Sequence, residues 1–285
     1  MNLLEQIVAT KRREIAERSA EKPLEDLLEV APEVPLPRLS DALAGDSLHV
    51  IAELKYQSPS HGPFLCQDPP ARVARGYARG GAAALSILTD EAYFKGRLGF
   101  LDEVRDIMER DWALSNDERE SEEDRNEPWR HRPLPLLRKD FILERYQVAE
   151  ARAHAASAFL LIVACLSRGR LADLREYGDE FGLEALVEVH DLFELDTALE
   201  SGARIIGVNN RNLKDFSVNL ETSFQAARRL EGESSLTLVA ESGLSTRSQL
   251  VELKDAGFSG FLIGTTFMET ASPGDALAAL LEDEY

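Results

Sequence analysis

The feature that most constrains the fold is a unit that repeats along the chain from about residue 48. Each unit contains a short apolar run, a polar loop and an amphipathic helical pattern that leads to the next apolar run. Runs that are apolar on both faces are typical of buried parallel strands, and the helical patterns supply the layers that cover them. Eight such runs occur: His49–Leu54, Ala83–Leu88, Leu134–Leu137, Phe159–Ala164, Ala185–Val189, Arg204–Val208, Leu236–Ala240 and Gly260–Ile263.

Eight strand–helix units in roughly 240 residues fit a closed barrel better than an open sheet. A doubly wound dinucleotide-binding sheet would usually carry a GxGxxG loop after its first strand, and the chain has none. Helix starts are also visible, because Asp68 precedes Pro69 and Pro70 and is predicted to be an N-cap. We therefore predict an α/β protein in which residues 46–285 form a (β/α)8 TIM barrel.

Two segments do not follow the repeat. An apolar stripe at helical spacing over residues 2–18 predicts that residues 1–45 form an N-terminal helical extension. Residues 115–131 (SNDERESEEDRNEPWRH) are polar and strongly charged, which predicts a flexible insertion. The insertion lies between a helical pattern and the next strand, so it falls on the N-terminal face of the barrel. That face generally serves stability rather than catalysis.

Composition excludes several classes of partner. The net charge of −19 disfavours nucleic acid and anionic membranes, since the long-range field repels both. No apolar run approaches the ~18–20 residues that span a bilayer, and no secretion signal is recognisable, so we expect a cytoplasmic protein without a membrane partner. Cys66 and Cys165 lie far apart, and the five histidines lack metal-binding spacing. We therefore expect no metal, with His190 in a supporting role. A monomeric chain is one oligomeric state that the sequence leaves open.

Polar side chains follow seven of the eight apolar runs, at the strand ends where barrel active sites are built. Glu53 and Lys55 are two residues apart, so on a strand they point to the same side. Carboxylates and lysines that are buried together shift one another's pKa, as acid–base catalysis requires, although ion pairs at a barrel mouth can also simply neutralise one another. The strand-end residues are Glu53, Lys55, Ser58 and Ser60; Thr89, Asp90 and Phe94; Lys139, Asp140 and Phe141; Glu188; Asn209, Asn210 and Arg211; Glu241, Ser242 and Gly243; and Gly264, Thr265 and Thr266.

The distribution of lysine along the chain also singles out these strand ends. The chain has 32 lysines and arginines, of which only seven are lysines, yet Lys55 and Lys139 both stand at strand ends. Lysine can release its proton at a workable pKa, whereas arginine cannot. The sequence therefore predicts a lysine that acts either as a general acid or as a Schiff-base nucleophile.

The last two strand ends predict a phosphate site. Glu241–Ser245 and Ile263–Thr266 each combine glycine with hydroxyl side chains. Glycine lets backbone N–H groups approach an anion closely, and the loops after strands seven and eight are the usual phosphate site of such barrels. Ordinary turn glycines are the alternative.

Together these motifs resemble the indole-3-glycerol-phosphate synthase family of tryptophan biosynthesis. The resemblance covers essentially the whole chain, including the extension, and the motifs occur in the family's order. Tyr56 and His61 depart from it, because basic residues are usual there, and the 115–131 insertion is longer than expected. The matching segments are IAELKYQSPS (51–60), LSILTD (85–90), LRKDFI (137–142), LLIV (160–163), LVEV (186–189), IGVNNRNL (206–213), AESGL (240–244) and FLIGT (261–265).

The resemblance implies a reaction that closes an indole ring. The substrate is 1-(2-carboxyphenylamino)-1-deoxyribulose 5-phosphate, and the products are indole-3-glycerol phosphate, carbon dioxide and water. Loss of carbon dioxide restores aromaticity, so no metal or organic cofactor is implied.

The resemblance also implies roles for individual residues. Lys139 would be the general acid at the substrate ketone, and Glu188 the general base of the dehydration. Lys55 and Arg211 would hold the anthranilate carboxylate, with Lys55 assisting as an acid in the loss of water. The remaining implied roles are orientation of the lysines (Glu53), positioning of Glu188 or of a substrate hydroxyl (Asn209), the apolar ring pocket (Phe94, Phe141, Leu160), and binding of the rest of the substrate and its phosphate (Ser58, Glu241, Ser242, Gly243, Gly264, Thr265).

Two other classes of function remain open on sequence grounds. Another phosphate-binding barrel, such as a sugar-phosphate isomerase or a Schiff-base aldolase, would use part of the same inventory. A non-catalytic phosphate-binding module would not require both Lys139 and Glu188.

Overall fold

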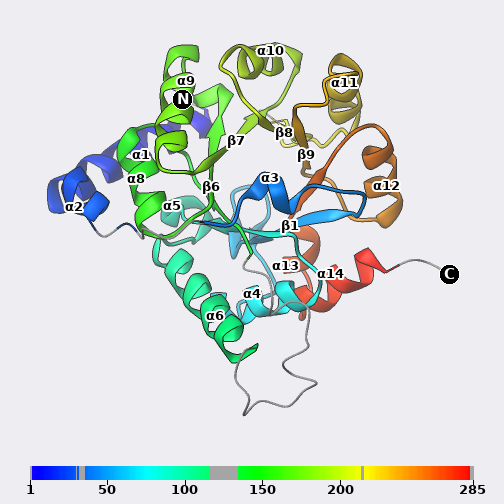
Figure 1. Ribbon diagram of the computed structural model, residues 1–285, viewed down its shortest axis with the longest axis horizontal. Coiled ribbons are helices and arrows are strands. Elements are labelled where there is room, and N and C mark those ends of the chain that lie inside the picture. The colour runs from blue at the N-terminus through cyan, green and yellow to red at the C-terminus, as the bar shows by residue number, and fades with distance from the viewer. Residues whose placement is uncertain (1, 30, 32–35, 116–133, 213–214, 283–285) are drawn as a thin grey trace.

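The computed structural model describes residues 2–29, 31, 36–115, 134–212 and 215–282. Its eight long strands are all parallel and close into a barrel in the order β1-β10-β9-β8-β7-β6-β5-β4, so the predicted (β/α)8 barrel is confirmed (Figure 1). Every predicted apolar run overlaps one strand. The strands are β1 His49–Leu54, β4 Ala84–Leu88, β5 Leu136–Lys139, β6 Ala158–Ile162, β7 Glu184–Val189, β8 Ile205–Asn209, β9 Thr237–Glu241 and β10 Gly260–Ile263.

Helices cover the outside of the barrel. The covering helices are α4 Pro70–Arg79, α6 Gly99–Ser115, α8 Arg145–Ala153, α9 Arg168–Glu180, α10 Leu192–Glu200, α11 Glu221–Arg229, α12 Arg247–Asp255 and α14 Pro273–Leu281. Short elements decorate the loops after the strands: β2 Gln57–Ser58, β3 Gly62–Pro63, α5 Glu91–Phe94, the 3₁₀ turn η2 Val163–Cys165 and α13 Thr265–Met268. Among the described residues, no helix combines the length and the apolar character needed to cross a membrane.

The N-cap predicted at Asp68 is wrong. The N-cap of α4 is Pro69, whose backbone is extended and whose side chain offers no capping oxygen. Asp68 lies one residue outside the helix, where its carbonyl accepts a hydrogen bond from the Tyr56 hydroxyl at 2.6 Å. Its carboxylate lies 3.3 Å from Arg72 Nε instead of binding the first-turn N–H groups.

The residues before β1 form the helices α1 Leu3–Glu21, α2 Leu24–Glu29 and α3 Leu39–Ala42, and they touch both ends of the barrel. At the N-terminal end, Leu39 and Leu43 join the apolar core inside the strands, and Ser40 is bonded through both backbone N–H and hydroxyl to Glu184 at the start of β7. Figure 1 shows α3 across the centre of the barrel. At the other end, α1 lies over the strand termini that carry the polar residues.

The polar segment predicted at residues 115–131 lies outside the described residues, apart from Ser115, at which α6 ends.

Candidate active site

A cavity of about 200 Å³ opens at the carboxyl ends of the strands. All fifteen residues predicted from the sequence to form the site lie in its wall, together with Leu3, Leu4 and Ile7 from α1. The predicted residues are Glu53, Lys55, Ser58, Phe94, Lys139, Phe141, Leu160, Glu188, Asn209, Arg211, Glu241, Ser242, Gly243, Gly264 and Thr265.

Charged side chains from four strands meet at the centre of this cavity. Lys139 Nζ lies 3.1 Å from Glu241 Oε2, 3.3 Å from Glu188 Oε2 and 4.0 Å from Glu53 Oε2. The other oxygen of Glu53 lies 2.7 Å from Lys55 Nζ. These side chains come from β1, β5, β7 and β9, which are alternate strands around the barrel. In such a barrel the side chains of alternate strands point into the same interior layer, which explains why residues far apart in sequence converge here.

The charges of neighbouring side chains determine the protonation states of Lys139 and Glu188. Burial alone would lower the pKa of Lys139, but the carboxylates of Glu241, Glu188 and Glu53 outweigh burial and raise the pKa well above its ordinary value. Burial would raise the pKa of Glu188, yet Lys139 and His190 hold it well below its ordinary value. Lys139 is therefore an ammonium and Glu188 a carboxylate at neutral pH.

Glu241 behaves differently from its neighbours. Burial, helped by the negative charge of Glu188, raises the pKa of Glu241 to about 7 even though Lys139 is close. Its Oε1 is buried and has no hydrogen-bond partner among the described residues. Glu241 is therefore the carboxyl group of the site that can gain or lose a proton near neutral pH.

His190 lies within ion-pair distance of Glu188 and Glu194. Its Nε2 lies 3.2 Å from Glu188 Oε1 and its Nδ1 lies 3.0 Å from Glu194 Oε2. Burial would lower the pKa of His190, but the two carboxylates raise it to about 10. The imidazolium therefore adds a third positive charge beside the two lysines.

An apolar wall closes one side of the cavity. The rings of Phe94 and Phe141 lie with centroids 6.2 Å apart at an angle of 39°, and Leu160 lies in the same wall. The sequence did not predict that α1 contributes to this wall. Its apolar stripe was visible, but a stripe at helical spacing indicates only burial, not what the helix covers.

The loops after β9 and β10 have structural reasons for their glycines. Ser242 and Gly243 both have a positive φ, of 65° and 78°. A Cβ on Gly264 would lie 2.7 Å from Glu53 Oε1, so glycine is needed there to accommodate the buried carboxylate. Thr266 Oγ1 donates a hydrogen bond to the carbonyl of Leu244 at 2.7 Å, which ties the two loops together.

The two departures from the resembling family have local partners. Tyr56 is buried and bonded to Asp68, as described above. His61 lies 2.7 Å from Glu269 and stacks on Phe64, with ring centroids 4.5 Å apart. Neither side chain is among the residues that line the cavity. In the described part of the chain, no group of three His, Cys, Asp or Glu residues could hold a metal ion.

Comparison with known proteins gives one consistent family. A family model described as indole-3-glycerol phosphate synthase matches residues 4–280. The indole-3-glycerol phosphate synthase of Desulfotalea psychrophila is 40% identical over 282 residues, with 98% of each chain covered. The protein of the same name from Laribacter hongkongensis is 39% identical over 284 residues, again with 98% of each chain covered.

Solved structures resemble the chain in fold alone. A thiamine phosphate pyrophosphorylase from Pyrococcus furiosus superposes with a TM-score of 0.56 at 15% identity, covering 82% of this chain and 93% of that one. A structure titled native KDPGal gives a TM-score of 0.53 at 15% identity, covering 84% of this chain and 93% of the other.

Proposed function

The chain belongs to the indole-3-glycerol phosphate synthase family, and we propose that Lys139, Glu188 and their charged neighbours carry out the family's reaction in the cavity described above. The enzyme is a carboxy-lyase of tryptophan biosynthesis. It converts 1-(2-carboxyphenylamino)-1-deoxyribulose 5-phosphate into indole-3-glycerol phosphate, carbon dioxide and water. The roles of the individual residues in this reaction are our proposal.

Ring closure begins at Lys139. The aromatic carbon that bears the carboxylate forms a bond to the ketone carbon, and the ketone oxygen takes a proton from the Lys139 ammonium. The three surrounding carboxylates support this role because they keep the ammonium charged until substrate arrives. Protonation of Glu241 removes one of those negative charges, which weakens the hold on the lysine proton and favours its transfer.

Decarboxylation and dehydration follow in the same site. When carbon dioxide leaves, the electron pair of the broken bond returns to the ring and restores its aromaticity. Glu188 then takes a proton from the intermediate while the new hydroxyl leaves as water, with Lys55 as its acid. The low pKa of Glu188 supports a carboxylate base, and Asn209 contributes to that low pKa through a hydrogen bond.

The remaining residues orient the substrate. Lys55, held by Glu53 at 2.7 Å, and Arg211 grip the anthranilate carboxylate and so lower the entropic cost of cyclisation. Phe94, Phe141 and Leu160 contact the ring. The phosphate and the adjoining hydroxyls are held by Ser58, Ser242, Gly243, Gly264 and Thr265.

The observation that carries this proposal is a largely buried lysine, with its side chain 13% exposed, whose Nζ lies within 4.0 Å of three carboxylates in a cavity that Phe94 and Phe141 also line. The direct test is an indole fluorescence assay with the carboxyphenylamino sugar phosphate. We expect a fluorescence increase matched by one equivalent of carbon dioxide. Folded protein that gives no signal would contradict the proposed assignment of substrate.

A Schiff-base mechanism is the alternative use of the same lysines. Reduction with borohydride in the presence of substrate would trap an imine on Lys55 or Lys139. We expect unmodified protein by mass spectrometry, because the surrounding carboxylates hold Lys139 protonated and an ammonium group cannot attack a carbonyl. A covalent adduct on either lysine would exclude the general-acid role.

We also propose a cytoplasmic location, in keeping with a biosynthetic enzyme whose Cys66 and Cys165 are both unpaired. A monomeric state stays a prediction, to be tested by sedimentation.

A further inference from the structure

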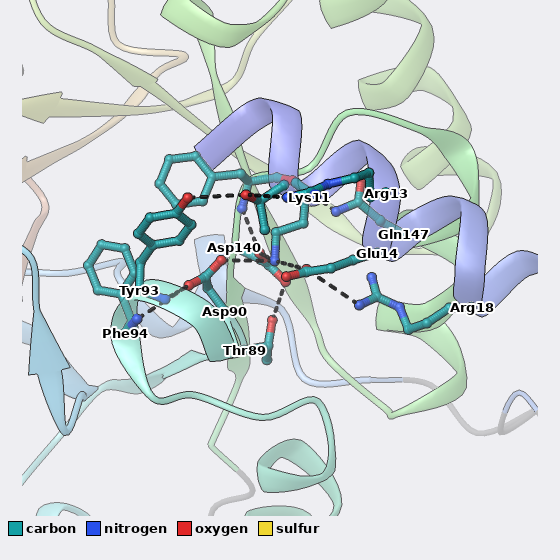
Figure 2. A network of polar contacts seen from close by, with 12 residues as sticks. Lys11, Arg13, Glu14, Arg18, Thr89, Asp90, Tyr93, Phe94, Asp140 and Gln147 are labelled. Carbon is teal, nitrogen blue, oxygen red and sulfur yellow. Dashed lines mark hydrogen bonds and ion pairs between the residues drawn. The ribbon is translucent and has the colours of Figure 1, made fainter. Parts of the chain in front are cut away.

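Lys11 is a fully buried charge at a place where the proposed reaction has no use for it. Its side chain is 1% exposed, on the inner face of α1 between Ile7 and Ile15. Figure 2 shows the amino group reaching from α1 into a group of carboxylates. Its Nζ lies 2.8 Å from Glu14, 2.9 Å from Asp90 and 2.9 Å from Asp140. A buried lysine with this many partners needs an explanation beyond helix packing.

The first strand-end partner, Asp90, shapes the loop that carries Phe94. One carboxylate oxygen, Oδ1, accepts hydrogen bonds from the backbone N–H of Tyr93 at 2.8 Å and of Phe94 at 3.3 Å, which caps the short helix α5. The other oxygen, Oδ2, faces Lys11. The orientation of the cap, and therefore of the Phe94 backbone, is fixed by the lysine on the opposite side of the same carboxylate.

The second partner, Asp140, shapes the loop that carries Phe141. Its Oδ1 accepts a hydrogen bond from the Phe141 N–H at 2.8 Å and also faces Lys11. Its Oδ2 accepts a hydrogen bond from the Thr89 hydroxyl at 2.7 Å and pairs with Arg138. Asp140 thus has a cationic partner on each side, Arg138 from β5 and Lys11 from α1.

A second contact joins α1 to the same region. The Thr10 hydroxyl lies 3.1 Å from the hydroxyl of Tyr93, the residue before Phe94. Adjacent residues of α1 therefore contact adjacent parts of the loop after β4. Leu3, Leu4 and Ile7 of the same helix line the cavity directly.

We propose that Lys11 is a positioning residue for the aromatic wall of the active site. By holding Asp90 and Asp140 together, it fixes the backbones that carry Phe94 and Phe141 and so sets the affinity for the aromatic ring of the substrate. The neighbouring phosphate loops after β9 and β10 contact neither carboxylate and are unaffected. The inference rests on the proposed function in one respect, namely that the ring of the substrate binds against these two phenylalanines.

The test replaces Lys11 by methionine, which keeps the length and removes the charge. Lys22→Met serves as the matched control, because Lys22 is an exposed lysine directly after the same helix. Two ligands probe separate parts of the site. Binding of 2-aminobenzoate reports on the pocket for the ring, and binding of inorganic phosphate reports on the loops after β9 and β10. For Lys11→Met we expect the dissociation constant of 2-aminobenzoate to rise roughly tenfold and that of phosphate to stay within about twofold. The control should change neither.

A second measurement does not depend on any ligand. The backbone N–H groups of Tyr93, Phe94 and Phe141 are the ones bonded to the two aspartates, so their hydrogen exchange should accelerate in Lys11→Met. If Lys11→Met does not fold, Asp90→Asn gives the same test, since the asparagine oxygen can still cap α5 while the charge facing Lys11 is lost. For Asp90→Asn we expect the same loss of 2-aminobenzoate affinity and the same faster hydrogen exchange, but smaller in size.

The outcomes separate this inference from the proposed function. Wild-type exchange at the three N–H groups, or equal loss of affinity for both probes in a folded variant, would overturn the positioning role. A wild-type protein that binds phosphate but not 2-aminobenzoate would instead contradict the proposed function. In that case the exchange measurement would still decide what Lys11 does.

Discussion

Two ionic clusters lie on either side of the chain at the carboxyl end of strand β5. The consecutive residues Arg138, Lys139 and Asp140 contribute to them alternately. Lys139 points into the cavity and joins the inner cluster, which consists of Glu53, Lys55, Lys139, Glu188, Glu241 and His190. Its neighbours Arg138 and Asp140 join the outer cluster, which consists of Lys11, Asp90, Arg138, Asp140 and Glu150. The alternation of side chains along a strand is enough to send adjacent charges to opposite faces.

The two clusters differ in the direction in which the pKa of a buried carboxyl group is shifted. In the outer cluster, Arg138 Nη1 donates a hydrogen bond to the Gln147 carbonyl at 2.6 Å, and its Nη2 lies 3.0 Å from Glu150 and 3.2 Å from Asp140. Burial would raise the pKa of Asp140, but Lys11 and Arg138 hold it well below its ordinary value. In the inner cluster, burial raises the pKa of Glu241 to about 7, and one of its oxygens is unbonded among the described residues.

This difference indicates which cluster does chemistry. The Asp140 carboxylate, whose pKa Lys11 and Arg138 hold low, stays ionised at neutral pH and does not exchange a proton there. A cluster that holds one carboxyl near its titration point can exchange a proton at neutral pH, as acid–base catalysis requires. The same residue types on the same strand therefore serve as scaffold on one face and as a candidate catalytic group on the other.

The largest effect is expected when the inner cluster loses its central charge. Lys139→Ala should lower kcat by ~10²–10⁴-fold, the usual contribution of a general acid. The indole fluorescence assay measures kcat, and Lys22→Ala is the control for the loss of an exposed lysine. Near-normal turnover by folded Lys139→Ala would show that the inner cluster is structural like the outer one.

The second prediction compares the stability of the two clusters directly. Asp140→Asn removes one buried carboxylate partner from Lys11 and from Arg138, and it should lower the free energy of unfolding by about 3–5 kcal/mol. Glu241→Gln removes a carboxylate that already competes with Glu188 and Glu53, so it should leave stability unchanged or raised while kcat falls. Urea unfolding of both variants measures the difference. Equal destabilisation would contradict the distinction between a structural outer cluster and a catalytic inner cluster.

The barrel and the inner cluster could be predicted from sequence because each depends on a local pattern. The apolar runs placed all eight strands to within two residues at either end, and the last two residues of the run Phe159–Ala164 lie in a 3₁₀ turn. A polar residue that follows such a run must lie at the mouth of the barrel, so the cavity residues followed from chain position alone.

The outer cluster could not be predicted in the same way, because its partners are separated by 79 and 129 residues from Lys11. One signal was present in the sequence. Lys11 stands four residues from both Ile7 and Ile15, so it lies on the buried stripe of α1 rather than on its exposed face. Helical spacing thus predicts that Lys11 is buried, but which carboxylates it meets depends on how α1 lies over the barrel.

The smallest effect concerns the third cation of the inner cluster, His190. Its pKa is about 10 in the folded protein, against an ordinary value of 6.5. A raised pKa contributes stability that is complete below pH 6.5 and is lost as the pH rises through 10. The wild-type free energy of unfolding should therefore fall with pH in this window, by at most about 1.4 kcal/mol per pH unit. His190→Gln, which cannot ionise, should lack that slope.

The measurement belongs between pH 7.5 and 8.5. The raised pKa of Glu241 contributes its own slope between its ordinary value of 4.5 and about 7, while that of Cys165, raised by burial to about 12, contributes only above 9. Glu241→Gln should therefore keep the slope in this window, and His190→Gln should not. Parallel curves for wild type and His190→Gln would mean that His190 is neutral in the folded protein. Three carboxylates would then face only two lysines, so the inner cluster would carry a net charge of −1 instead of 0, the same net charge as the outer cluster with its two cations and three carboxylates.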